Sequence, residues 1–114
     1  MRILSVMTVP AEASGGLPTQ EDMERMGSFI AEMRGSGVLI DTGGRMPDML
    51  ELAVARQNGK TTITDGPFTE TKEVVGGYAL LEVKDRDEAI AVTNRFLDLI
   101  GNATCHLHEV EVAP

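Results

Sequence analysis

Short runs of aliphatic and β-branched residues, bounded by glycine, proline and polar residues, predict the strands of this chain. They cover residues 2–9, 38–42, 50–56, 60–64, 77–83 and 104–112. The runs at 50–56 and 60–64 flank Asn58-Gly59, and both residues of this pair accept the positive φ of a tight turn. These two runs therefore predict a β-hairpin.

The stretch that begins at Thr19 has helical spacing instead. Thr19 and Asp22 match a capping box at its start, and Gly35 and Gly37 suit a left-handed stop at its end. Its apolar stripe consists of Met23, Met26, Ile30 and Met33. We expect this stripe to pack in the core. The alternative is an adaptable, methionine-lined binding groove.

A second helix is predicted after Asp85. Asp85 and Glu88 have the spacing of a capping box, in which Asp85 caps the helix and Glu88 reaches back to it. The helix runs to Ile100, and Gly101 ends it. The residues expected on its inward face are Ala89, Val92, Thr93, Phe96 and Ile100.

The predicted order is strand, helix, strand, hairpin, strand, helix, strand, without a repeat or a linker. Residues 1–114 are therefore expected to form one α+β domain. Because two helices cannot cover both faces of so wide a sheet, we expect them on one face of an antiparallel, ferredoxin-like sheet. The other face then needs a cover, and a second copy of the chain is the simplest one. The sequence thus predicts a homodimer.

Charge and composition narrow the range of partners. The net charge of −8 and the pI of about 4.6 disfavour nucleic acid and anionic membrane surfaces as partners. No apolar run approaches the ~20 residues that span a bilayer, and no secretory leader pattern opens the chain. Cys105 is the single cysteine, which excludes an internal disulfide. Together these features favour a cytoplasmic location.

The most informative segment, residues 65–78, reads DGPFTETKEVVGGY. An aspartate in a turn usually accepts a hydrogen bond from the backbone N–H two residues on, but Pro67 has no N–H. The carboxylate of Asp65 is therefore either a cap for a short helical turn over residues 68–73 or a free acid, base or ligand contact.

The rest of this segment carries two further alternatives. Lys72 either belongs to a solvated charge cluster with Glu70 and Glu73 or anchors an anion. Gly76-Gly77 predicts a bulge or a close backbone approach where the next strand begins.

The segments 65–68, 70–73, 76–78 and 81–83 resemble, almost position by position, the DGPF subgroup of the YCII-related proteins. The resemblance extends over essentially the whole chain and implies a ferredoxin-like α+β fold whose sheets meet in an α/β-barrel-like dimer. Enzymes similar to this family pair a histidine of the first helix with a downstream aspartate. No histidine occurs in the predicted first helix here, so this chemistry is not carried over.

The two histidines of the chain, His106 and His108, lie two residues apart in a predicted strand and therefore share one face. Two ligands on one face are too few for a closed metal site, so no metal is expected. Either imidazole is a candidate base if a dimer encloses that face. Cys105 lies on the opposite face and is expected to be a buried, inert thiol.

Two classes of function follow. In the first, the chain is a regulatory or accessory module that binds a small molecule in a cleft near Asp65 and Tyr78. In the second, it is an enzyme acting on a small organic acid by acid–base chemistry. A purely structural dimer is the third alternative, and no pattern for a cofactor occurs. The candidate catalytic residues are Asp65 and His106, and the candidate ligand-binding residues are Arg45, Lys72, Tyr78 and His108.

Overall fold

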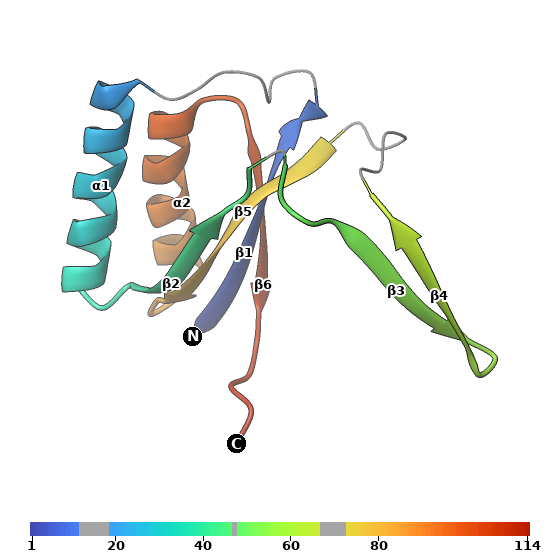
Figure 1. Cartoon of the computed structure of the whole chain (residues 1–114). Helices are drawn as coiled ribbons and strands as arrows, with labels where there is room; N and C mark the ends of the chain where they lie inside the picture. Colours follow the sequence, from blue (N-terminus) through green and yellow to red (C-terminus); the bar gives the residue numbers. More distant parts are fainter. Residues whose placement is uncertain (12–18, 47, 67–72) are drawn as a thin grey trace.

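The structure is a computed structural model that describes residues 1–11, 19–46, 48–66 and 73–114 (Figure 1). It contains the predicted elements in the predicted order. The elements are β1 (Arg2–Pro10), α1 (Gln20–Gly35), β2 (Leu39–Gly44), β3 (Leu52–Gln57), β4 (Lys60–Asp65), β5 (Glu73–Glu82), α2 (Arg86–Ile100) and β6 (Thr104–Glu109).

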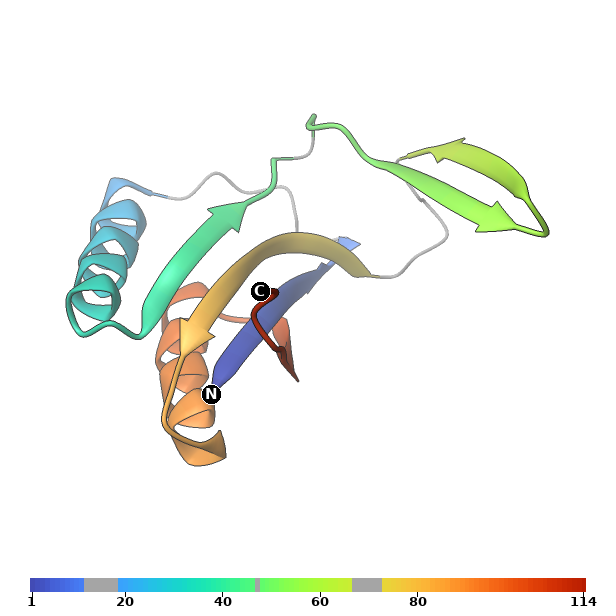
Figure 2. The same cartoon turned by 90° about the horizontal axis from the view of Figure 1, so that it is seen from below.

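The main sheet has the strand order β2-β5-β1-β6, and every neighbouring pair is antiparallel. This is the split βαβ arrangement of ferredoxin-like domains. Both helices lie on the same side of the sheet (Figures 1 and 2). The prediction of an α+β, ferredoxin-like fold with its helices on one face is thus confirmed. We call the side that faces the helices the inner face and the other side the outer face.

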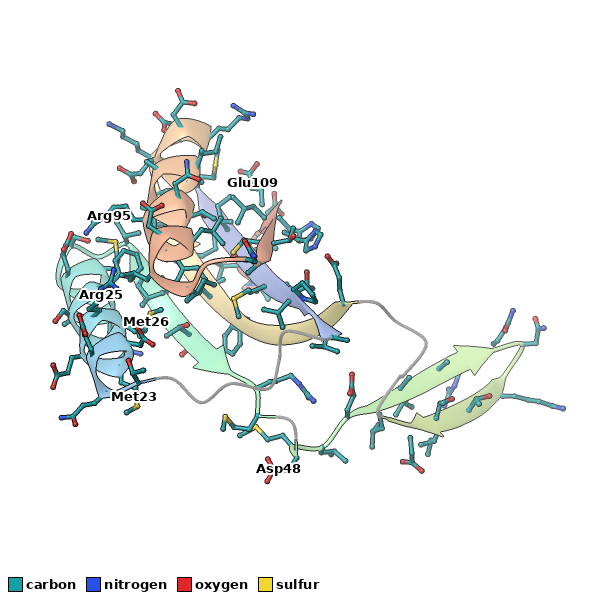
Figure 3. The ribbon with its side chains drawn as sticks, turned by 90° about the horizontal axis from the view of Figure 1, so that it is seen from above. Met23, Arg25, Met26, Asp48, Arg95 and Glu109 are labelled. Carbon is teal, nitrogen blue, oxygen red and sulfur yellow. The ribbon has the colours of Figure 1, made fainter. Side chains whose placement is uncertain are left out.

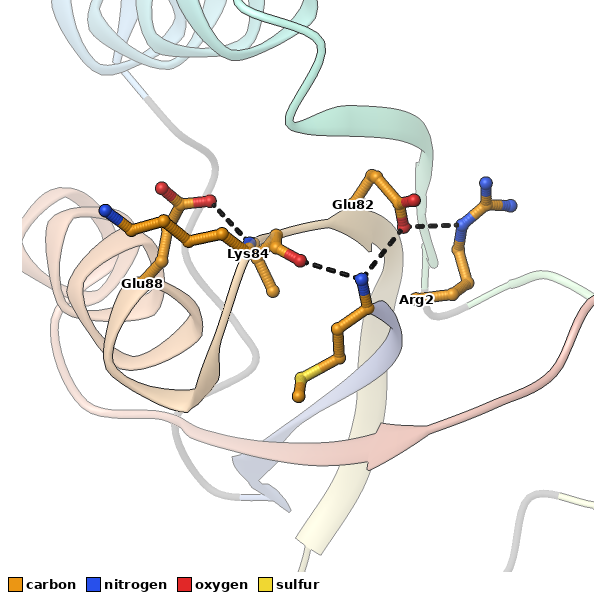
Figure 4. A network of polar contacts seen from close by, with 6 residues as sticks. Arg2, Glu82, Lys84 and Glu88 are labelled. Carbon is orange, nitrogen blue, oxygen red and sulfur yellow. Dashed lines mark hydrogen bonds and ion pairs between the residues drawn. The ribbon is translucent and has the colours of Figure 1, made fainter.

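The helix starts follow from their capping residues. Thr19 Oγ1 accepts a hydrogen bond from Asp22 N at 3.1 Å, and Asp22 Oδ2 accepts one from Thr19 N at 3.2 Å, which confirms the first capping box. Asp85 Oδ1 accepts from Glu88 N at 2.9 Å, as predicted. The return contact differs, because Glu88 Oε1 accepts from Lys84 N at 3.0 Å and not from Asp85 (Figure 4).

Strand β5 begins earlier than the sequence predicts. It starts at Glu73, because β1 extends to Pro10 and pairs with it there. Glu73 is therefore in a strand and not in the helical turn expected over residues 68–73, whose other members lie outside the described residues. The register shifts between Met7 and Thr8, which leaves Gly76 without a direct partner and confirms a bulge at this glycine pair.

The core is small and lies where α1 and α2 cover the sheet. It consists of Ile3, Met33, Leu39, Leu81, Val83 and Ala89. Met33 confirms the inward stripe of α1, whereas Met23, expected on the same stripe, is 56% exposed because it lies in the first turn. No helix within the described ranges is long and apolar enough to cross a membrane.

Strands β3 and β4 form a separate two-stranded sheet, the β3–β4 arm, that projects from the domain (Figures 1 and 2). Its hairpin turn at Asn58 (φ 53°) and Gly59 (φ 78°) confirms the predicted turn. The radius of gyration is 16.0 Å, whereas a compact domain of this length has about 13 Å. The arm accounts for this extended shape.

Replacing Asp85 by alanine tests the capping of α2. The variant removes the acceptor for Glu88 N, and we expect the free energy of unfolding to fall by about 1 kcal/mol. Urea unfolding measures this change. Asp87→Ala is the control, because Asp87 also lies in the first turn but is not the cap. Equal losses in the two variants would contradict a specific capping role.

Candidate functional site

A cavity of about 480 Å³ lies between the helices and the inner face of the sheet. We call it the interlayer cavity. Its helical walls are formed by Met26, Phe29, Ile30, Met33, Val92, Thr93, Phe96 and Ile100. Its sheet wall is formed by Ser5, Met7, Leu39, Thr42, Gly43, Gly44, Gly76, Gly77, Tyr78, Ala79, Leu81 and Cys105. None of these described lining residues carries a charged side chain.

The periodicity of each strand and helix decides which of its side chains face the cavity. Ser5 and Met7 of β1 alternate with outer residues and therefore point to the same face. On α2, the inward residues predicted from the sequence reach the cavity or, in the case of Ala89, the core. Met26 lies on the side of α1 that faces the sheet (Figure 3). Met26 and Met33 of the methionine stripe thus line a cavity, which agrees with the alternative interpretation of this stripe as part of a binding groove.

An ion pair joins the two helices above the cavity. Arg95 Nη1 donates to Glu32 Oε2 at 2.6 Å and Arg95 Nη2 donates to Glu32 Oε1 at 3.0 Å. The guanidinium also lies 5.2 Å from the ring centroid of Phe29, which lines the cavity. The hydrogen bonds from Arg95 lower the pKa of Glu32. Figure 3 shows Arg95 on the side of α2 next to α1, where this pair holds the helical wall together.

Four glycines, Gly43, Gly44, Gly76 and Gly77, form the part of the cavity wall where β2 meets β5. We call them the glycine wall. A Cβ atom on Gly43 would lie 2.6 Å from Tyr78 Cε1, and one on Gly77 would lie 2.7 Å from the carbonyl oxygen of Gly43. Both distances are too short for any side chain. Gly43 is therefore needed for the position of the Tyr78 ring, and Gly77 for the close approach of the two strands.

Tyr78 connects the glycine wall to a carboxylate. Its Oη donates a hydrogen bond to Asp41 Oδ2 at 2.8 Å. This hydrogen bond, together with desolvation and the negative charge of Asp41, raises the pKa of the Tyr78 hydroxyl. Tyr78 is therefore a neutral donor at physiological pH, and its aromatic ring packs against Gly43 on the outer face of the sheet.

Cys105 lies on the inner face of β6 and lines the cavity. Burial raises the pKa of its thiol, and a hydrogen bond with Ser5 opposes this shift only in part. The thiol is therefore protonated at neutral pH and is a weak nucleophile.

The structure separates the residues that the sequence singles out. Asp65 lies at the end of β4, is exposed, and is paired with Leu52 within the arm. Arg45 donates to the carbonyl oxygen of Leu50 at 3.1 Å and lies 3.7 Å from Glu51 Oε2, so it ties down the base of the arm. Lys72 lies outside the described residues. The predicted roles of these three residues stay predictions.

The histidines lie on the outer face. His106 is the register partner of Val6, which also pairs with Tyr78, so the three residues share that face with Val6 in the middle. His108 pairs with Leu4. His106 Nε2 is 3.5 Å from Thr8 Oγ1. The described residues include no cluster of three or more potential ligands that suits a metal ion.

Sequence reasoning found Tyr78 but missed its partner Asp41 and the cavity positions of Ser5 and Cys105. The signal that was present is the pair of Gly-Gly doublets in two strands. The role of these doublets becomes clear only when the strand pairing is known, since Gly44 lies directly opposite Gly77. Apolar cavity positions, by contrast, have the same sequence pattern as an ordinary core.

Comparison with known protein families gives one match. The model of the YCII-related domain matches residues 4–96, a range that runs from β1 into α2 and includes the glycine wall. No curated protein matches the chain.

Titration of the single tyrosine tests the Tyr78–Asp41 pair. The chain contains no tryptophan, so the tyrosinate absorbance reports on Tyr78 alone. We expect a pKa above the usual value of about 10, because the hydrogen bond to Asp41 favours the protonated hydroxyl. The stabilising contribution of this bond is present below the usual pKa and is lost as the pH rises through the raised pKa.

Two variants make this titration specific. Asp41→Asn removes the negative charge, and Gly43→Ala displaces the ring, so both are expected to lower the pKa of Tyr78 towards its usual value. Gly27→Ala, in a helix where an added Cβ meets nothing within 4 Å, is the control and should leave the pKa unchanged. An identical titration curve in wild type and Asp41→Asn would contradict the assignment.

Proposed function

The chain belongs to the YCII-related family, and we propose that it is a binding module for a small, neutral, mostly apolar molecule held in the interlayer cavity. The observation that carries this proposal is the composition of the cavity wall. A quarter of the residues of the chain are charged, yet none of the described residues that line this space is. Its volume of about 480 Å³ lies within the range of small-molecule pockets, about 300–1,000 Å³.

The chemistry of the wall limits the ligand. Polar side chains reach the cavity only from Ser5, Thr42, Thr93 and Cys105 among the described residues, because the Tyr78 side chain lies on the outer face. They offer a few hydrogen bonds and no counter-ion. A charged ligand would lose its hydration without compensation, which is costly in an apolar site. The proposed ligand therefore has an apolar body and at most a few hydrogen-bonding groups.

The family resemblance supports two finer proposals. The DGPF-type motif that begins at Asp65 favours membership of that subgroup and a regulatory or accessory role for the module. The outer face supports a homodimer, because its apolar residues Leu4, Val6 and Leu80 are only half-buried in a single chain. A second copy that covers this face would remove them from water.

Acid–base catalysis has less support than binding. Asp65 lies on the arm and His106 on the outer face, and neither is among the residues that line the cavity. The titratable side chain that does line it, Cys105, has a raised pKa and so holds its proton at neutral pH. We therefore place binding, and not turnover, at this site.

Filling the cavity tests the proposal. Thr93 lines the cavity from α2, whereas its neighbour Asn94 is exposed. Thr93→Leu places extra atoms in the cavity, and we expect it to weaken the binding of a neutral apolar fluorophore such as N-phenyl-1-naphthylamine at least about tenfold, a loss of about 1.4 kcal/mol. Fluorescence titration measures the affinity.

Asn94→Leu is the matched control, because it adds the same side chain one residue away on the solvent side. Its affinity for the fluorophore should equal that of wild type. Thermal unfolding of both variants shows whether the domain is intact. If wild type does not bind the fluorophore, or if both leucine variants bind it as wild type does, the cavity is not the binding site.

A further inference from the structure

The β3–β4 arm carries an unpartnered apolar surface. Side chains alternate along its strands, so Leu52 and Val54 of β3 share one face with Ile63 of β4, which is paired directly with Val54. Their exposed fractions are 39%, 63% and 64%. We call these three residues the apolar face of the arm. The opposite face carries smaller or more polar residues, among them Ala55 and its partner Thr62.

This surface has no cover within the described part of the chain. Every residue of β3 and β4 is exposed, and the two strands pair only with each other. Contacts at the base hold the arm in place: Gly66 N donates to Glu51 O at 2.7 Å, and Arg45 lies beside Glu51. A two-stranded hairpin alone is only marginally stable in water. The arm is therefore expected to gain order from a surface outside its own chain.

The outer face of the main sheet is a second apolar surface that the helices do not cover. The helices cover only the inner face (Figures 1 and 2). The outer face presents Leu4, Val6 and Leu80 half-buried, and Tyr78 42% exposed. One chain therefore carries two uncovered apolar surfaces. Figure 2 shows the arm extending away from its own sheet, so the arm does not cover the outer face of its own chain.

The charges of the two surfaces are also complementary. The arm strands carry two cations, Arg56 and Lys60, and one acid, Asp65, although the whole chain has 18 acidic and 10 basic residues. Arg56 alternates with Val54 and therefore lies on the apolar side of the arm, whereas Lys60 and its partner Gln57 lie on the opposite side. Among the described residues, the Arg56 side chain donates only to Thr61 Oγ1, at 2.9 and 3.1 Å. Neither cation forms an ion pair with another described residue.

The outer face supplies the matching acids. Asp41 shares this face as the register partner of Leu80, and its side chain accepts hydrogen bonds only from Tyr78 and the backbone of Thr42 among the described residues. Glu73 accepts from Thr8 Oγ1 at 3.2 Å. Neither acid forms an ion pair within the described ranges. The cation on the apolar side of the arm, Arg56, thus matches Asp41, a carboxylate of the outer face that forms no ion pair among the described residues.

We propose that the arm of each protomer docks on the outer sheet face of a second copy of the chain. Its apolar face covers the aliphatic residues there, and Arg56, on the same side of the arm, pairs with Asp41. A twofold arrangement buries both arms and both outer faces at once, because each chain supplies one of each. The inference goes beyond a homodimer, since it names the two segments that meet.

Docking in this way changes the surroundings of the candidate site. Asp41 holds the hydroxyl of Tyr78 next to the glycine wall. A cation from a second copy at Asp41 would therefore lie on the outer side of the glycine wall, whose inner side lines the interlayer cavity. His106 and His108, which share the outer face with Val6 and Leu4, would lie under the arm and away from solvent.

Substitutions on the two faces of the arm test the contact. The double variant Val54→Asp/Ile63→Asp places charges on the apolar face, and we expect its dimer dissociation constant to rise at least about tenfold, because buried anchors dominate interfaces. Ala55→Asp/Thr62→Asp adds the same charges to the opposite face and should dimerise as wild type does. Sedimentation equilibrium over a concentration series measures association, and circular dichroism confirms that each variant is folded.

Charge reversal locates the partner surface. Arg56→Glu reverses the charge on the apolar side of the arm, and Asp41→Lys reverses the charge that it meets on the outer face. Each variant alone should dimerise more weakly than wild type, because like charges then meet. An equimolar mixture should form a heterodimer at least about tenfold more tightly than either variant associates with itself, since both of its arm contacts again join opposite charges.

Three results would overturn the proposal. The first is a wild-type chain that stays monomeric at every concentration. The second is dimerisation of Val54→Asp/Ile63→Asp that equals that of wild type or of its opposite-face control. The third is a mixture of the charge-reversed variants that associates no better than its components. Fluorophore binding in the cavity is measured separately, so failure of the arm contact is distinguishable from failure of the proposed binding function.

Discussion

The pairing of β1 with β5 and β6 decides which side chains reach the cavity and which stay outside it. Side chains alternate along a strand, so a shift of one residue in this register would exchange the two faces. Ser5 faces the helices and Val6 faces away, and Tyr78 and His106 follow Val6 because they are its register partners. The bulge at Gly76 absorbs one extra residue of β5, so that Val75 and Glu73 share a face with their partners Thr8 and Pro10 beyond it.

The interlayer cavity exists because the two layers are joined mainly at one end. The buried core gathers around Ile3, Leu81 and Val83, where α2 begins and the sheet is covered. Towards the glycine wall the sheet offers backbone in place of side chains, and the helices are held to each other by the pair of Arg95 and Glu32. A domain built in this way keeps open space next to strands that are still fully paired.

The sequence predicts features that depend on neighbouring residues. The capping box of Thr19 and Asp22 and the turn at Asn58-Gly59 are examples, because their hydrogen bonds and dihedral angles are local. The family-type motif and the order of the elements likewise predict the ferredoxin-like topology. These features cover most of the fold.

The features that sequence alone could not predict depend on distance in space. Asp65 was correctly expected at the end of a strand, but alternation within β4 does not say that this strand belongs to an arm and not to the main sheet. The Glu88 carboxylate accepts a hydrogen bond from the backbone N of Lys84, the residue before the cap, and not from that of Asp85. The choice between these two neighbouring donors depends on the path of the chain before the helix. The cavity depends on the separation of two layers, which no local pattern encodes.

The register at the glycine wall shows where the arm enters the topology of the sheet. Gly44 and Gly77 are paired, and Arg45 N donates to Gly76 O at 2.9 Å, so the segment that carries the arm leaves and re-enters the sheet at adjacent positions. In a simple ferredoxin-like domain, a short turn would join β2 to β5 at this point. The β3–β4 arm is therefore inserted at the turn between two paired strands, and the strand order of the main sheet does not depend on it.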